Sequence, residues 1–226
     1  MKNNAQVFLS AYMITAMVHL FCLAAQKEQA ETISKILLMP FLIGYVIVSA
    51  GNTIKPALFL LIALLFSWAG DIILLNSGED VYFMFGLASF LCAQIAYIFT
   101  FKKFSLKNTQ RISGFYFVPF IIYATALFIL VYPKLDTMLL PVALYTIIIT
   151  LMGIAALARK GKTTSYSFQF VLIGAISFIV SDSLIAINKF YNSFNAASIC
   201  IMLTYIVAQY LIATGCVLHL WQSKEN

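Results

Sequence analysis

The chain has 226 residues, of which 62% are apolar and only 10% are charged, and its formal net charge is +6. Soluble domains carry about 25% charged residues, so the composition excludes an ordinary soluble protein. The basic excess follows a membrane-topology pattern, described below, and we therefore expect no nucleic-acid partner.

Eight apolar stretches follow one another along the chain, and each is long enough to cross a hydrocarbon core of ~30 Å, which needs about 20 residues. We expect these spans at 6–25, 33–50, 56–76, 81–101, 113–132, 137–158, 168–188 and 195–221. The connections are short and polar. The sequence therefore predicts an all-α polytopic membrane protein, with residues 1–226 forming a single integral membrane domain.

The basic residues predict the orientation of the spans. With a cytoplasmic N-terminus, the cytoplasmic side carries Lys2, Lys55, Lys102, Lys103, Lys107, Arg111, Arg159, Lys160, Lys162 and Lys224. The opposite side carries only Lys27, Lys35, Lys134 and Lys189. The positive-inside rule then predicts that both termini are cytoplasmic (N-in/C-in). We expect a multi-pass integral membrane protein, which in a bacterium would lie in the plasma (inner) membrane.

The two halves of the chain share short phrases in the same order. Residues 37–40 resemble residues 138–141, and two aspartate phrases, 67–75 and 179–186, occupy the third and seventh spans. This pattern indicates either a 4+4 parallel tandem repeat or chance similarity among leucine-rich helices. A repeat of four spans keeps its orientation, so its axis would run along the membrane normal.

Asp71 and Asp182 are the two carboxylates that fall inside the spans. An ionised aspartate at the centre of a spanning helix costs about 2.5–3.5 kcal/mol on insertion scales. At 1.5 Å per residue, both lie roughly 7–10 Å below the outer boundary. Each is either a structural hydrogen-bonding residue between helices or part of a shared functional site, and the matching contexts favour the site.

Several other polar residues of the spans are candidates for substrate binding. Lys35 either extends to the membrane interface or binds a phosphate. The remaining candidates either bridge helices or contact a substrate, and they are Tyr145, Ser181, Gln94, Tyr205 and Gln209. The two histidines lie at opposite depths and no cysteine cluster accompanies them, so we expect no metal site and no cofactor. Pro40 and Pro141 are expected near the ends of their spans.

The phrases that carry these residues resemble the YhhN family, which includes lysoplasmalogenases of animals. The matching segments run in order through nearly the whole chain: 34–40, 66–75, 85–90, Pro141 with Tyr145, 174–184, and Tyr205 with Ala208-Gln209. The chain departs from the family pattern at two positions. Members often have histidine where Gln94 stands, so this chain lacks a candidate acid-base or hydrogen-bonding group there, and they often have proline where Ile36 stands.

The resemblance implies that a lysophospholipid is the substrate and that its vinyl ether bond is hydrolysed to a fatty aldehyde and a glycerophospho-base. This chemistry needs one protonated carboxyl group and one carboxylate, as in glycosidases, and no metal. Our hypothesis takes Asp182 as the acid and Asp71 as the carboxylate, and the reverse order stays open at this point. The protein is expected to work within membrane lipid as a monomer or homodimer.

Two other classes of function remain open at this point. A proton-coupled transporter of lipids or small molecules could use the same aspartate pair to bind and release protons. A different lipid hydrolase, or a binding protein, could also be built on the same eight spans. Analysis of reaction products would separate an enzyme from a transporter.

Overall fold

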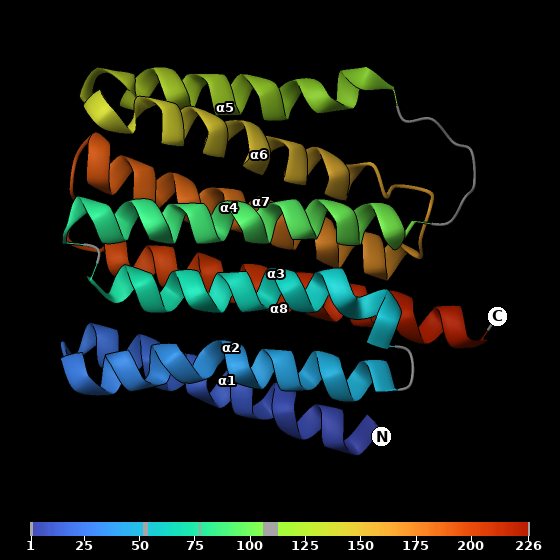
Figure 1. Cartoon of the computed structure of the whole chain (residues 1–226). Coiled ribbons are helices and arrows are strands. Elements are labelled where there is room, and N and C mark those ends of the chain that lie inside the picture. Colours follow the sequence, from blue (N-terminus) through green and yellow to red (C-terminus); the bar gives the residue numbers. More distant parts are fainter. Residues whose placement is uncertain (1, 52–53, 77, 106–112, 226) are drawn as a thin grey trace. The chain divides into compact units, whose positions relative to one another are not determined.

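The structure is a computed structural model that describes residues 2–51, 54–76, 78–105 and 113–225 (Figure 1). Within these ranges, eight helices are long and apolar enough to cross a membrane, which confirms the predicted all-α architecture with eight spans. They are α1 (Lys2–Ala24), α2 (Glu28–Ala50), α3 (Ile54–Ile73), α4 (Asp80–Lys103), α5 (Val118–Val131), α6 (Leu139–Leu157), α7 (Ser165–Phe190) and α8 (Ala197–Glu225). Short 3₁₀ turns extend α3, α5 and α6. They are η2 (Leu74–Asn76) after α3, η3 (Gly114–Phe117) and η4 (Tyr132–Lys134) on either side of α5, and η5 (Asp136–Met138) before α6.

Charges at the helix ends explain where some helices begin and stop. The first turn of α2 contains Glu28 and Glu31, and α4 begins at Asp80 and ends at Lys102 and Lys103. Acidic groups at an N-terminus and basic groups at a C-terminus favour the helix dipole. This is why α2 begins five residues before the apolar stretch predicted from hydropathy.

The earlier start of α2 corrects one expectation. Pro40 lies near the middle of α2, which runs from Glu28 to Ala50 without interruption, and not near an end of its span. Pro141 is the third residue of α6, as expected. A proline in the first turn of a helix is tolerated because its missing N–H has no intrahelical partner there.

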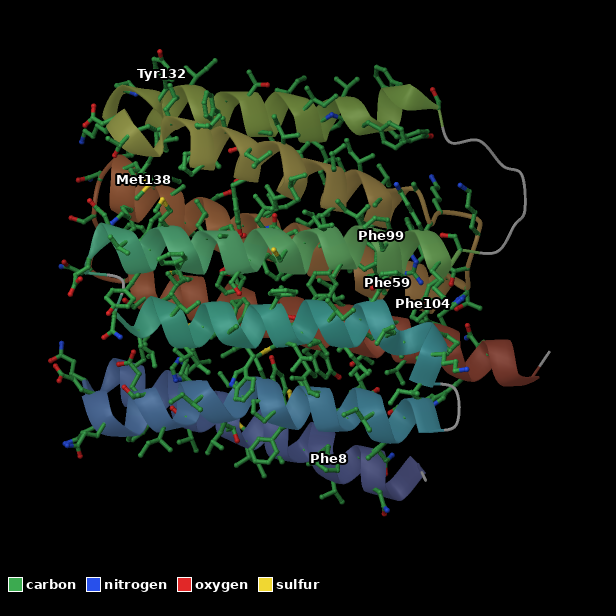
Figure 2. All side chains as sticks on the ribbon, viewed as in Figure 1. Phe8, Phe59, Phe99, Phe104, Tyr132 and Met138 are labelled. Carbon is green, nitrogen blue, oxygen red and sulfur yellow. The ribbon has the colours of Figure 1, made fainter. Side chains whose placement is uncertain are left out.

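The chain divides into two compact units, one of residues 1–100 with 216–226, and one of residues 101–215. In the first unit, α1 packs on α2, and α2 packs on α3. The rings of Phe59 in α3 and Phe99 in α4 stack with their centroids 5.4 Å apart; both residues are labelled in Figure 2. The last turns of α8 belong to this unit as well, because the Trp221 indole donates a hydrogen bond to Ser49 O over 3.2 Å.

In the second unit, α6 packs on both α5 and α7. The contact between α7 and α8 is close at Gly174, where a Cβ atom would lie 2.9 Å from the backbone nitrogen of Ile212 and 3.0 Å from Ala208 O. Small residues are the usual means by which helices approach closely in membranes, where burial of apolar surface gives little driving force.

Gly174→Ala is therefore expected to destabilise the protein by about 1–3 kcal/mol, the usual cost of overpacking. The new methyl group would meet backbone atoms of α8, which cannot rotate away. Gly78→Ala is the matched control, since a Cβ atom there meets nothing within 4 Å. Thermal unfolding of both variants in lipid nanodiscs measures the effect, and equal midpoints would contradict the close contact.

Arg159, directly after α6, is completely buried. Its guanidinium group donates hydrogen bonds to Phe104 O (3.4 Å), Ser167 O (3.3 Å) and Ser167 Oγ (2.9 Å). The Ser167 hydroxyl in turn donates to Gly215 O over 2.7 Å. One arginine thus joins the segment after α4 to α7, and Ser167 continues the connection to α8. The sequence analysis treated this residue only as a topology signal and missed its structural role.

The predicted N-in/C-in orientation, the 4+4 repeat and the single domain over 1–226 stay predictions. Lys107 and Arg111, two of the basic residues used for the orientation, lie outside the described residues.

Candidate functional site

Asp71 lies in the last turn of α3, within the first unit, and is only 4% exposed. It interacts electrostatically with Tyr12 of α1, which also interacts with Tyr97 of α4. Both tyrosines are buried, with exposures of 1% and 0%. Ser67, one turn before Asp71, is fully buried, and its hydroxyl has no hydrogen-bond partner within the described segments. Asp71 therefore sits in a polar cluster supplied by three helices.

Gly70, beside Asp71, allows close approach of an aromatic ring. A Cβ atom at this position would lie 2.7 Å from Phe90 Cε2 of α4. On the same pair of helices, the Ser89 hydroxyl donates a hydrogen bond to Phe66 O over 2.7 Å. The glycine thus brings α4 against the helix that carries Asp71, and α4 is also the source of Tyr97 and of fully buried Gln94.

The beginning of α2 lies against the end of α3. The Trp68 indole, three residues before Asp71, donates a hydrogen bond to Ile36 O over 2.9 Å. Three residues of helix rise about 4.5 Å, so the half-buried Lys35, next to Ile36, stands near the depth of Asp71. This contact places Lys35 of α2 and Asp71 of α3 in one layer of the first unit, which we call the polar layer.

His19 of α1 completes this layer, and the sequence analysis did not select it. Its Nδ1 lies 3.0 Å from Ser34 Oγ and 3.3 Å from Glu31 O. The imidazole is fully buried, and its Nε2 has no hydrogen-bond partner among the described residues. Leaving such a group unpaired in a protein interior costs about 1–3 kcal/mol. The spacing of seven between Tyr12 and His19, which puts them on one helix face, was the signal that could have identified both.

Asp182 lies in α7, in the second unit, and is half-buried. The Tyr145 hydroxyl of α6 donates a hydrogen bond to its Oδ2. The flanking serines are engaged with the backbone: Ser183 donates to Ile179 O over 2.6 Å, and Ser181 donates to Ile201 O of α8 over 3.0 Å. The structure thus brings two of the predicted site residues, Tyr145 and Asp182, into direct contact.

The remaining predicted residues of this unit lie on α8. Tyr205 is 4% exposed and meets the ring of Phe178 edge-on, with the centroids 5.8 Å apart. Gln209 follows one turn later and is fully buried. Phe178 is itself one turn before Asp182, so the Tyr205 ring supports the helix that carries the carboxyl group. The substrate contacts predicted for Tyr205, Gln209 and Ser181 stay predictions.

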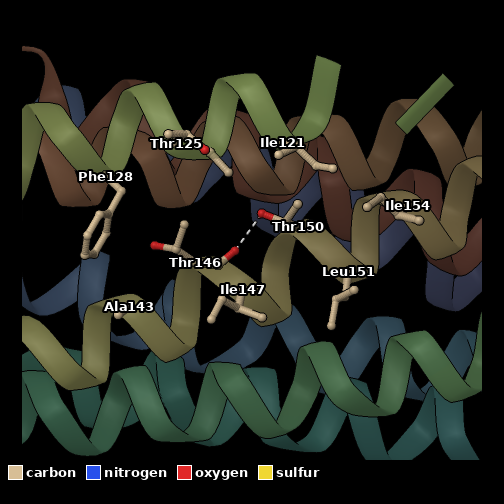
Figure 3. A pocket seen from close by; sticks show the side chains of 10 residues that line it. Ile121, Thr125, Phe128, Ala143, Thr146, Ile147, Thr150, Leu151 and Ile154 are labelled. Carbon is tan, nitrogen blue, oxygen red and sulfur yellow. Dashed lines mark hydrogen bonds between the residues drawn. The ribbon is translucent and has the colours of Figure 1, made fainter. Parts of the chain in front are cut away.

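An apolar groove of about 430 Å³ runs between α5 and α6 of the second unit (Figure 3). Thr146 and Thr150 line it, but their hydroxyls donate to carbonyls of their own helix, Val142 O and Thr146 O, over 2.8 and 2.6 Å. The rest of the lining consists of Thr125 and of the apolar residues Ile121, Ala124, Phe128, Ala143, Ile147, Leu151 and Ile154. The groove offers a surface suited to hydrocarbon and contains no acid or base.

The predicted site residues are thus divided between the units, with Lys35, Asp71 and Gln94 in the first and Tyr145, Asp182 and the α8 residues in the second. The expectation that the two carboxylates share one site stays a prediction. Within the described ranges, no group of three histidine, cysteine or acidic residues is placed to hold a metal ion.

Comparison with known proteins supplies independent information. The model of the YhhN family matches residues 30–216. Proteins named lysoplasmalogenase from Mycobacterium bovis and Mycobacterium tuberculosis are each 28% identical over 158 residues, which is 68% of this chain. The match spans 58% of the length of these relatives. No solved structure matches the chain.

Proposed function

The chain belongs to the YhhN family, and on that premise we propose that it hydrolyses the vinyl ether bond of lysoplasmalogens. The relatives named lysoplasmalogenase support this substrate class. The observation that carries the chemistry is the hydrogen bond from Tyr145 to Asp182, which orients a carboxyl group inside an apolar helical unit. An oriented carboxyl group shielded from bulk water is suited to proton transfer.

The reaction begins with transfer of a proton to the β-carbon of the vinyl ether. The C=C π electrons form the new C–H bond, and the positive charge is shared by the α-carbon and the ether oxygen as an oxocarbenium ion. Water adds to the α-carbon and loses a proton, which gives a hemiacetal. The hemiacetal hydroxyl then loses its proton and forms the C=O bond as the bond to the glycerol oxygen breaks and that oxygen takes up a proton, which releases a fatty aldehyde and a glycerophospho-base. The net change consumes one water and no redox equivalent.

We assign the acid to Asp182 and the carboxylate to Asp71. Oδ2 of Asp182 accepts the hydrogen bond from Tyr145. In this assignment, the proton that passes to the substrate is therefore carried by Oδ1 of Asp182. Asp71 stabilises the oxocarbenium ion and accepts a proton from the attacking water, a division of roles that glycosidases use with paired carboxyl groups. Lys35 binds the phosphate of the headgroup near the interface. We assign substrate contacts to Gln94 in the first unit and to Gln209, Tyr205 and Ser181 in the second.

Product analysis of the purified protein tests this function. Given a lysoplasmalogen, the protein in lipid nanodiscs is expected to release a fatty aldehyde detectable by mass spectrometry. The matched control is the saturated-ether analogue, which has no double bond to protonate and should yield no aldehyde. Absence of aldehyde from the vinyl ether would overturn the proposal, and release of other products would indicate a different lipid hydrolase.

The transporter alternative predicts no aldehyde from either lipid. One observation favours the enzyme: α3 and α7 run as continuous helices through Asp71 and Asp182. Transporters commonly place their coupling sites at interrupted helices. Transport of lipid across the bilayer of sealed liposomes without product formation would reverse this preference.

A further inference from the structure

Two contacts of the His19 Nδ1 atom suit one tautomer of this buried imidazole. Because a carbonyl oxygen can only accept, we assign the hydrogen to Nδ1, where it points to Glu31 O, 3.3 Å away. Ser34 Oγ gives its own proton to Glu31 O over 2.9 Å and therefore also accepts from Nδ1. In a neutral imidazole with hydrogen on Nδ1, the other nitrogen is a pure acceptor.

The accepting nitrogen, Nε2, is left unmatched. The histidine is 0% exposed, and no described group donates to Nε2. Lys35 interacts electrostatically with the ring. The protein thus holds a neutral hydrogen-bond acceptor ready for a donor that its own described residues do not provide.

The position of His19 relates this acceptor to the candidate site. Ser34, its partner, precedes Lys35, and Ile36 accepts the hydrogen bond of Trp68. Trp68 is one turn of α3 before Asp71. His19, the proposed phosphate-binding lysine and the proposed catalytic carboxylate therefore belong to one layer of the first unit.

We propose that His19 determines specificity for lysolipids by accepting, at Nε2, a hydrogen bond from the free glycerol hydroxyl of the substrate. This proposal rests on the proposed function and extends it to the glycerol group. The hydroxyl is the donor that distinguishes a lysolipid from a diacyl lipid, and it lies between the phosphate and the ether oxygen. An acylated glycerol has no donor at this position and would leave Nε2 unmatched, and sites built around a substrate hydroxyl discriminate strongly against analogues that lack it.

The test compares two substrates and two variants of the full chain in lipid nanodiscs. The substrates are a lysoplasmalogen and its 2-deoxy analogue, which lacks only the hydroxyl. His19→Asn keeps an amide N–H near the position of Nδ1 and removes the acceptor, whereas His19→Gln places an amide oxygen near the position of Nε2. For the wild type we expect kcat/KM to be about tenfold higher with the hydroxyl, the effect of one well-placed hydrogen bond.

His19→Asn is expected to remove this preference, chiefly by raising KM for the hydroxylated substrate while leaving the 2-deoxy substrate unchanged. His19→Gln is expected to restore part of the preference. An equal fall with both substrates would assign His19 a purely structural role and overturn the proposal. An unchanged preference in His19→Asn would also overturn it.

A binding measurement separates failure of this proposal from failure of the proposed function. If the wild type releases no aldehyde, the saturated-ether lysolipid and its 2-deoxy analogue are compared for their effect on the thermal unfolding midpoint. A rise that depends on the hydroxyl in the wild type but not in His19→Asn supports the assignment of His19. Equal rises in both proteins, or no rise in either, reject it.

Discussion

Asparagine in place of Asp182 or Asp71 is expected to lower kcat for lysoplasmalogen hydrolysis by about 10²–10⁴-fold, the usual contribution of a general acid or base. An amide cannot transfer the proton, yet its oxygen can still accept the hydrogen bond that Tyr145 donates to Asp182. The loss should therefore appear in the chemical step and not in folding. Release of aldehyde under saturating substrate measures it.

Asp80→Asn provides the control for the removal of a carboxylate. Asp80 is an exposed residue at the start of α4, outside the candidate site, and its variant should turn over substrate at close to the wild-type rate. Tyr145→Phe should reduce kcat less than Asp182→Asn does, because it removes the orienting contact and keeps the acid. Wild-type turnover by a correctly inserted aspartate variant would remove that residue from the mechanism.

Arg159→Met is expected to destabilise the protein by about 3–5 kcal/mol, because hydrogen bonds to charged groups each contribute about 1.5–3 kcal/mol and buried partners are left unpaired. Methionine fills part of the volume but donates nothing to Phe104 O, Ser167 O and Ser167 Oγ. Unfolding by heat or denaturant in nanodiscs measures the change.

Lys160→Met tests whether the effect of Arg159 comes from burial or only from charge. Lys160 is the next residue, carries the same charge and is exposed, with its ammonium group 4.9 Å from the centroid of the Tyr116 ring. Losing that contact should cost at most about 1 kcal/mol. Equal destabilisation by the two variants would show that the hydrogen bonds of Arg159 are not what stabilises the second unit.

The spans could be predicted from the sequence because hydropathy over about 20 residues reports the environment directly. The boundaries were less accurate. Helix α2 begins at Glu28 because acidic residues are stabilising at a helix N-terminus. Hydropathy alone registers these residues only as hydrophilic and assigns them to a loop. Pro40 was misplaced for the same reason.

The candidate site was predicted only in part. Asp71 and Asp182 stand out because carboxylates are rare in spans, and Tyr145, which donates a hydrogen bond to Asp182, was among the other candidates. Tyr12 and His19 were not selected, because aromatic residues and histidines also serve as packing in apolar helices. Their importance depends on which face of α1 meets its neighbours, and that is decided by tertiary packing.

Helix α5 differs from the other spans in how little of it is covered. Among its residues, Val118–Val131, only Val131 is buried, and we therefore expect its position beside α6 to depend on the surrounding acyl chains. Extraction into a short-chain detergent removes that lateral support, and α5 should be the first span to exchange its amide hydrogens for deuterium. We then expect the width of the groove between α5 and α6 to change with bilayer thickness. Measurements on this protein are therefore best made in native-like lipid of defined chain length.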